Sequence, residues 1–333
     1  TTRNRIYALD AVTGAEVWQV NLGPPVPLSN LPCGNINPLG ITGTPYLDVA
    51  RRMIFLDAMM LVAGAPRHRI FALSLDDGST VAGWPVDVDS TVTFGGFTFD
   101  SSVQNQRGAV LVVGDTVYVP YGGHYGDCGD YRGWLVGVPI ASPSTPMAWA
   151  TRADGAGSWA PGGVASDGTD LFLATGNGFG ATTWSDQEAI LRLTPGPAFS
   201  GATTDFFSPS NWLALDAGDI DLGGAGPVLI HVAGATPADL AVALGKDGNA
   251  YIIDLGNMGG IGMATDMLHV SPRAIVTAAS AYPTSSGVNV VYRAQGTGCT
   301  GDMTALRITA TSPPTIERAW CADGHGQGSP IAT

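Results

Sequence analysis

Arg5-Ile6-Tyr7-Ala8-Leu9-Asp10, followed by Thr13-Gly14 and then Trp18, is the stretch that decides the fold. It returns as Arg69-Ile70-Phe71-Ala72-Leu73, followed by Asp77-Gly78 and Trp84. Each copy reads as an alternating strand, a glycine-containing turn and a second strand whose tryptophan can wedge between neighbouring units. Such self-similarity at intervals along a chain indicates a repeat architecture. Weaker echoes are Ala250-Tyr251-Ile252-Ile253-Asp254 and Thr304-Ala305-Leu306-Arg307-Ile308.

A second pattern opens each unit with small residues that lead into a buried strand. The starts lie near residues 43, 108, 162, 226, 275 and 328. They are roughly 50 to 65 residues apart, a period that gives four strands with generous loops per unit, as in the blade of a β-propeller. No segment sustains a helical period of apolar residues, so we expect few helices.

We therefore predict an all-β fold with a single domain over residues 1–333, a β-propeller of four-stranded blades. The pattern gives about six blades, and seven or eight if the chain is a fragment. Residues 328–333 resemble the inner strand of a blade, and residues 4–20 resemble the outer hairpin of one. Pairing of the two termini, with residues 1–20 completing the last blade, would close the ring and remove exposed sheet edges.

Composition supports a globular β protein and excludes some partners. Of 333 residues, 45% are hydrophobic and 13% are charged, with 46 glycines and 23 prolines, which suits many short strands and tight turns. The formal charge of −13 argues against nucleic acid and anionic membranes as partners. No apolar run is long enough for a transmembrane segment.

The four cysteines are isolated, and none has the CxxC spacing of a zinc site. Cys299 and Cys321 flank one predicted hairpin, so we pair them, which leaves Cys33 to pair with Cys128. Two disulfides indicate an oxidising compartment, and we expect a secreted, periplasmic or cell-surface protein.

The repeat is similar to that of the pyrroloquinoline quinone (PQQ) dehydrogenases, and several further motifs occur in an order that resembles a group of extracellular PQQ-binding-like repeat proteins of bacteria and fungi. The motifs that carry this second resemblance are Gly40-Ile41-Thr42-Gly43-Thr44-Pro45, Gln104-Asn105-Gln106-Arg107-Gly108, His124-Tyr125-Gly126-Asp127, Tyr131-Arg132-Gly133-Trp134, Ala174-Thr175-Gly176-Asn177-Gly178 and Asp219-Ile220-Asp221-Leu222-Gly223.

The resemblance implies three cofactor-binding candidates. Trp159 stands where the family has a tryptophan under the quinone, and Asn177 stands where it has a calcium-binding asparagine. Lys246, the only lysine, lies in a segment like the one whose cation reaches the quinone. The alternative is structural: a core tryptophan, a turn asparagine and a lysine exposed to water.

Three elements of the quinoprotein chemistry are missing. The family's calcium-binding glutamate falls at His124, and imidazole is a poor ligand for Ca²⁺. The catalytic aspartate should follow Trp212, but Leu213 stands there, and an aspartate after it could substitute only if the backbone register shifts. No two cysteines are adjacent, so the family's vicinal disulfide cannot form.

Two polar clusters could bind a ligand. The loop with His124, Asp127, Asp130 and Tyr131 could hold a metal or a sugar, or it is a long loop pinned by Cys128. Asp216, Asp219 and Asp221 have the oxygen-rich spacing of a structural calcium site, although the same carboxylates could serve caps and turns.

We therefore expect an extracellular propeller that acts as a binding or scaffolding module for a protein or glycan. No cofactor is certain: PQQ is disfavoured, and structural calcium remains open. One alternative is a PQQ- and calcium-dependent oxidoreductase of alcohols or sugars. A second is glycan binding through the aromatic residues Tyr121, Tyr125 and Trp134. Whether the chain is an enzyme is left open, with the missing groups arguing against it.

Overall fold

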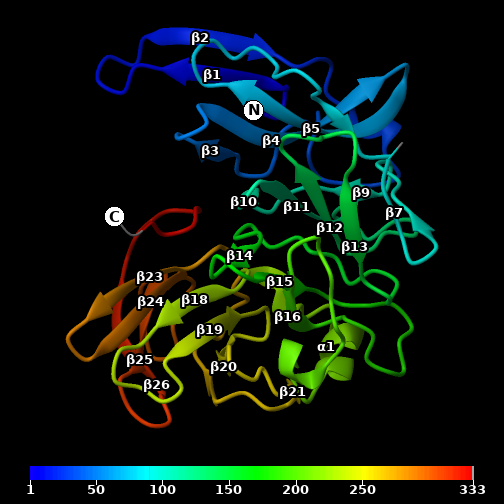
Figure 1. The fold of residues 1–333 in the computed structure, drawn as a ribbon. Coiled ribbons are helices and arrows are strands. Elements are labelled where there is room, and N and C mark those ends of the chain that lie inside the picture. Colours follow the sequence, from blue (N-terminus) through cyan, green and yellow to red (C-terminus); the bar gives the residue numbers. More distant parts are fainter. Residues whose placement is uncertain (90, 332–333) are drawn as a thin grey trace. The chain divides into compact units, whose positions relative to one another are not determined.

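The computed structural model describes residues 1–89 and 91–331, and its elements are mostly antiparallel β-sheets (Figure 1). The chain divides into two compact units, residues 1–150 and residues 151–333. Residues 328–331 form no strand, and residues 332 and 333 lie outside the described residues. A single domain closed through its termini therefore stays a prediction.

The first unit begins with a hairpin of β1 (Arg5–Leu9) and β2 (Glu16–Asn21). The Trp18 Nε1–H donates to the Leu75 carbonyl at 3.0 Å, and the indole lies over Gly78 in the turn of the neighbouring repeat. A Cβ at position 78 would approach Trp18 Cε3 to 2.8 Å, and the φ of Gly78 is +73°. The predicted tryptophan wedge is confirmed, and the turn glycine is required both by its backbone angle and by the ring above it.

Two four-stranded antiparallel sheets complete the first unit. The first contains β3 (Tyr46–Asp48), β4 (Met53–Val62), β5 (Ala65–Ser74) and β6 (Val86–Asp87). The second contains β10 (Leu111–Val113), β11 (Thr116–Gly123), β12 (Trp134–Pro139) and β13 (Met147–Ala150), with β9 (Gln104–Asn105) paired to the end of β11. Between the two sheets in sequence is a short pair, β7 (Thr93–Phe94) and β8 (Phe97–Thr98).

The second unit holds three further sheets. They are β14 (Ala165–Ser166), β15 (Leu171–Thr175), β16 (Ala189–Leu193) and β17 (Phe206–Ser208), with β21 (Gly260–Ile261) parallel to β17; β18 (Val228–His231), β19 (Asp239–Leu244), β20 (Asn249–Asp254) and β22 (Asp266–His269); and β23 (Ser280–Thr284), β24 (Gly287–Arg293), β25 (Met303–Thr309) and β26 (Ile316–Ala322).

Helices are few, as predicted. The described residues contain one α-helix, α1 (Trp212–Gly218), and short 3₁₀ helices at Leu28–Asn30, Thr203–Asp205 and Leu222–Gly224.

The small residues at the start of each repeat lead into the first strand of a sheet. The starts near 43, 108, 162, 226 and 275 precede β3, β10, β14, β18 and β23. A Cβ on Gly162 would come within 2.7 Å of the Ala225 carbonyl oxygen, because the backbones meet closely there. The small-residue pattern therefore follows from the close approach of successive repeats.

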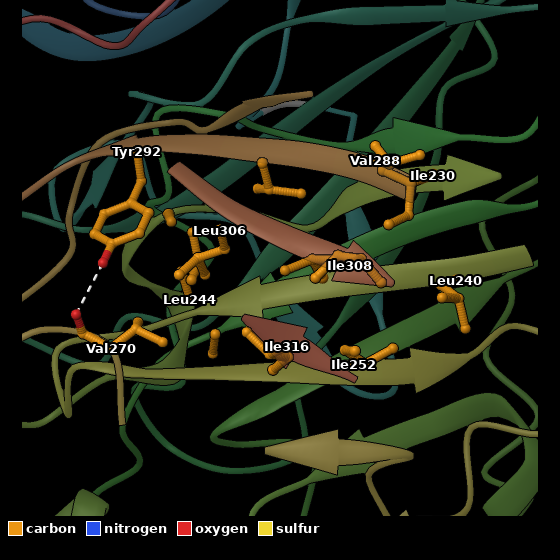
Figure 2. Close-up of a cluster of buried hydrophobic side chains, with 14 of the residues drawn as sticks. Ile230, Leu240, Leu244, Ile252, Val270, Val288, Tyr292, Leu306, Ile308 and Ile316 are labelled. Carbon is orange, nitrogen blue, oxygen red and sulfur yellow. Dashed lines mark hydrogen bonds between the residues drawn. The ribbon is translucent and has the colours of Figure 1, made fainter. Parts of the chain in front are cut away.

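The sheet of β18, β19, β20 and β22 is buried on both faces, as the side chains of β19 show. Leu240, Val242 and Leu244 enter the core shared with β23–β26, where the Tyr292 hydroxyl donates to the Val270 carbonyl at 3.0 Å (Figure 2). Ala241 and Ala243 enter a separate core toward β15 and β16. Because side chains alternate along a strand, a sheet packed between two others reads as a continuous apolar run.

Both predicted disulfides are present. Cys299–Cys321 lies in the second unit, and Cys33–Cys128 lies in the first.

Candidate functional site

Trp159 and Lys246 meet in the second unit, and Asn177 lies beside the carboxylate that binds the lysine. Lys246 is in the turn between β19 and β20, Trp159 precedes β14, and Asn177 follows β15. Lys246 Nζ lies 5.4 Å from the centroid of the Trp159 ring. The Asn177 backbone N–H donates to Asp221 Oδ1 at 2.7 Å. Residues from three separate segments of the sequence therefore lie close together in the fold.

Two aspartates hold the ammonium of Lys246. Nζ donates to Asp219 Oδ1 at 2.8 Å and to the Asp219 carbonyl at 3.2 Å, and it forms a short ion pair with Asp221 Oδ2. Burial lowers the pKa of Lys246, but the charge of Asp221 and the hydrogen bonds to both carboxylates outweigh it and leave the pKa above its usual value. The lysine is thus charged and already paired.

Among the acidic residues near Lys246, Glu188 is the least exposed, with no exposed surface. Its Oε2 accepts the Leu222 N–H at 2.6 Å, and its Oε1 has no hydrogen-bond partner. Burial first, and the Asp221 charge second, raise the pKa of Glu188 to about 9. The side chain is therefore a neutral carboxylic acid at pH 7. We call Trp159, Asn177, Glu188, Asp219, Asp221 and Lys246 the Lys246 cluster.

Gly176 packs directly against the Lys246 cluster and leaves no room for a side chain. A Cβ at this position would lie 3.1 Å from Trp159 Nε1 and closer still to the Asp221 carboxylate. A side chain here would displace one or the other.

The three aspartates that were predicted to bind a metal have different partners. Asp219 and Asp221 bind Lys246, whereas Asp216 Oδ1 accepts the Gly178 N–H at 2.8 Å. Within residues 1–89 and 91–331, no group of three or more His, Cys, Asp or Glu side chains is arranged to hold a metal ion. The calcium prediction gains no support from this geometry.

Leu213 lies in α1 and its side chain is half exposed, at 50%. Asp219 and Asp221 both contact Lys246, and the sequence offered both as calcium ligands and as substitutes for the catalytic aspartate after a register shift. Asp221 follows α1, directly precedes the 3₁₀ turn at Leu222–Gly224 and is buried.

The residues of the predicted loop cluster do not converge on one ligand site. His124 is buried, its Nε2 faces the Ser102 carbonyl at 3.2 Å, and burial lowers its pKa to about 4. The Tyr131 hydroxyl donates to Asp127 Oδ1 at 2.8 Å. Asp127 and Asp130 are exposed, unlike the buried His124. The structure therefore favours the structural reading of this disulfide-pinned loop.

The prediction that three aromatic residues form an exposed glycan-binding surface is wrong for two of them. Tyr121 and Trp134 are 0% and 1% exposed and belong to the core of the first unit, and only Tyr125 is exposed. Aromatics on β11 and β12 face inward because both faces of this sheet are covered.

Sequence reasoning missed a buried polar cluster in the first unit. His68 Nδ1 lies 2.7 Å from Asp57 Oδ1, and His68 Nε2 lies 3.1 Å from the Gln104 carbonyl. The Tyr121 hydroxyl donates to Asp57 Oδ2 at 2.9 Å. Both imidazole nitrogens face acceptors, so both carry a proton and the ring is an imidazolium. We call Asp57, His68, Gln104 and Tyr121 the His68 cluster. The sequence feature that could have revealed this cluster was Asp57, the one charged residue in the apolar run of β4.

The pKa of His68 agrees with this assignment. Burial would lower it, but the Asp57 charge and hydrogen bond raise it above the usual value overall.

Comparison with known proteins identifies the fold. No protein-family model and no curated protein matches the sequence. A quinohemoprotein alcohol dehydrogenase from Comamonas testosteroni matches with a TM-score of 0.59 at 15% identity, over 92% of this chain and 50% of that one. A second, from Pseudomonas putida, gives 0.57 at 14% identity, over 92% and 50%. A europium-containing methanol dehydrogenase gives 0.54 at 15% identity, over 97% and 64%.

The chain therefore has the β-propeller fold of the PQQ dehydrogenases. It spans about half the length of the two quinohemoproteins. At this identity the likeness extends to the fold alone.

The residues of the Lys246 cluster do not fit the quinone and calcium that the fold family implies. PQQ carries several carboxylates, but the ammonium of Lys246 is already bound to Asp219 and Asp221, whose two carboxylates leave an excess of negative charge. Glu188 is neutral, so it is a weak metal ligand. All four cysteines are committed to the two disulfides described above.

Proposed function

We propose that this chain is an extracellular propeller that acts as a binding or scaffolding module and does not carry out quinoprotein turnover. The observation that carries the proposal is the double pairing of Lys246 with Asp219 and Asp221 above Trp159. A cation engaged in this way is not available to a quinone. The two disulfides favour an oxidising compartment.

A surface segment of the second unit supports a protein partner. Ile261, Met263, Met267 and Leu268 are 45%, 68%, 53% and 40% exposed within eight residues of sequence. Exposed apolar side chains gathered in one segment mark interaction surfaces, and methionine adapts to irregular partners. Among the described residues no helix combines the length and apolar content needed to span a bilayer.

Dye-linked alcohol oxidation tests the absence of turnover. We expect no reduction of the dye when PQQ is added with Ca²⁺, or with Eu³⁺, and a primary alcohol or an aldose. Substrate-dependent reduction that requires PQQ would overturn the proposal.

Site-specific photocrosslinking tests the binding surface. A photoreactive amino acid at Met263 should capture one defined protein from the extracellular fraction of the native host, and the same group at the exposed Val49 of the first unit should not. Equal capture at both positions, or none at Met263, would contradict a partner at this segment.

The convergence of Trp159 and Lys246 favours one alternative, a PQQ- and calcium-dependent oxidoreductase. It requires Lys246 to leave Asp219 and Asp221 when the quinone binds. The dye assay decides between the two, because only the alternative gives turnover.

A further inference from the structure

β22 is the last strand of its sheet, and its outer edge is open. The Val270 N–H donates to the Gly248 carbonyl, in the turn before β20, at 2.8 Å. Because hydrogen bonds alternate along an antiparallel pair, the backbone groups of Leu268 point toward β20 and those of Met267 and His269 point away from it. All three residues are exposed. The N–H and C=O of Met267 and the N–H of His269 therefore face solvent.

The last strands of the four other large sheets are protected from further pairing. β6 has two residues, β13 is half-buried or buried throughout, and β17 is paired with β21 on its outer side. β26 carries the exposed charges Glu317 and Arg318, and a register shift interrupts its ladder. Short, covered, charged or bulged edges keep a sheet from pairing with a further strand. β22 instead exposes the apolar side chains of Met267 and Leu268.

An extended peptide segment is the occupant that suits this edge. Only another strand presents N–H and C=O groups at the spacing of the open groups of Met267 and His269. Side chains of an added strand would lie beside Met267 on one face of the sheet and beside Leu268 on the other. Asp266 is already engaged, since its Oδ2 accepts the Ile316 N–H at 2.8 Å. The formal charge of −13 favours a basic segment over an acidic one.

We infer that β22 is a β-augmentation site, which binds an extended, basic segment of a partner protein whose apolar side chains cover Met267 and Leu268. The bound segment becomes the fifth strand of the sheet formed by β18, β19, β20 and β22. The inference rests on the proposed function, because it names the kind of partner that the binding module takes and the edge on which that partner binds.

Binding of a synthetic peptide tests the open edge. The probe is a fluorescein-labelled octapeptide of alternating valine and lysine, titrated with the whole chain and followed by fluorescence anisotropy. The control peptide has the same sequence with its amide nitrogens methylated, so it keeps the charges and side chains and loses its N–H donors. We expect saturable binding of the probe, and binding of the control that is weaker by about tenfold or more, because the hydrogen bonds to β22 are lost. Equal affinities would overturn the inference.

Met267→Pro and Met267→Ala form a matched pair of variants. The Met267 N–H makes no bond to β20, and an edge strand tolerates proline at such a position. Both variants lose the methionine side chain, but only proline also removes the N–H and places a ring at the open edge. Met267→Pro should weaken probe binding by about tenfold or more, and Met267→Ala should weaken it less. Equal losses would overturn the inference, since the side chain alone would then carry the binding.

Amide hydrogen exchange, followed residue by residue by NMR, tests the wild-type chain without a variant. In the free chain the Met267 amide should exchange faster than the Leu268 amide, which is bonded to β20. Saturation with the probe peptide should slow exchange at Met267 and His269 by about tenfold or more. Equal protection of Met267 and Leu268 in the free chain, or no slowing with bound probe, would overturn the inference.

Sedimentation distinguishes a partner protein from a second copy of this chain. The wild type should be monomeric, and a dimer that Met267→Pro converts to monomers would overturn the assignment, because a second copy would then occupy the edge. Failure of the probe to bind, together with capture at Met263 and no dye reduction, would overturn this inference alone. Dye reduction that requires PQQ would instead overturn the proposed function, so the two failures are distinguishable.

Discussion

The His68 cluster of the first unit and the Lys246 cluster of the second both bury an aspartate against a cation, but they differ in charge balance. Asp57 and His68 form one carboxylate and one imidazolium, and the groups around them complete their hydrogen bonds. Lys246 faces two carboxylates and lies near a carboxyl group that stays protonated. The first arrangement balances one carboxylate with one cation, and the second places one cation between two carboxylates beside a protonated acid.

Asp57→Ala should show the largest effect, because it breaks the balanced cluster. It leaves the His68 imidazolium and the Tyr121 hydroxyl buried without their acceptor. We expect a loss of about 3–5 kcal/mol in the free energy of unfolding, measured by urea denaturation. Asp115→Asn, which removes an exposed partner of Arg51, should cost less than about 1 kcal/mol. Similar losses in both variants would show that the His68 cluster contributes no special stability.

Glu188→Gln tests the protonated carboxyl group of the Lys246 cluster through pH. The folded pKa of about 9 lies above the unfolded value of 4.5, so the native chain holds a proton that the unfolded chain has lost. This contribution is complete below pH 4.5 and declines as the pH rises toward 9, by about 1.4 kcal/mol per unit at most.

Gln mimics the neutral acid and removes that decline. The variant should match the wild type near pH 5 and exceed it by about 2–4 kcal/mol at pH 8, in urea denaturation at both values. A constant difference between the two proteins would mean that Glu188 is ionised in the native state.

A double-mutant cycle of Lys246→Met and Asp221→Asn measures how strongly the Lys246 pair is coupled. We expect a coupling free energy of about 1–3 kcal/mol, since the pair is in direct contact and mostly buried. The single variant Lys246→Met should be less stable than the double variant, because it retains the excess acid. Additive effects would place the lysine outside the cluster.

His124 should give the smallest effect. Its folded pKa of about 4 lies below the usual 6.5, so the native state resists protonation and stability falls as the pH drops through this window. His124→Gln should remove about 1 kcal/mol of that fall by pH 5.5. His68 does not obscure the result, because its raised pKa keeps it protonated in both states below pH 6.5 and affects stability only at higher pH. Parallel pH curves for the two proteins would contradict the assignment.

Short sequence patterns predicted the blades because the interactions that form a blade lie within one repeat or between adjacent repeats. Alternating strands, turn glycines such as Gly78 and the wedge of Trp18 follow from backbone angles and from contacts between adjacent repeats. The disulfide Cys299–Cys321 was predictable for the same reason, since one hairpin brings its cysteines together. Closure of a ring concerns distant segments and stays a prediction.

The candidate site was predictable only in part. A resemblance indicated Trp159, Asn177 and Lys246, but the partners of the lysine depend on how α1 and the next turn position Asp219 and Asp221. Glu188 gave no signal, since its importance comes from complete burial beside another carboxylate. Asp57 and His68 lie on neighbouring strands whose register had to be known before they could be paired.

Lysine-selective NMR tests the central claim most directly, because Lys246 is the only lysine of the chain. In protein labelled with ¹⁵N-lysine, one ammonium signal reports on the cluster. We predict a pKa above the usual value for lysine, and a signal that does not change when PQQ and Ca²⁺ are added. A lysine that titrates like one in solution, or a signal that shifts on addition of PQQ and Ca²⁺, would contradict the account.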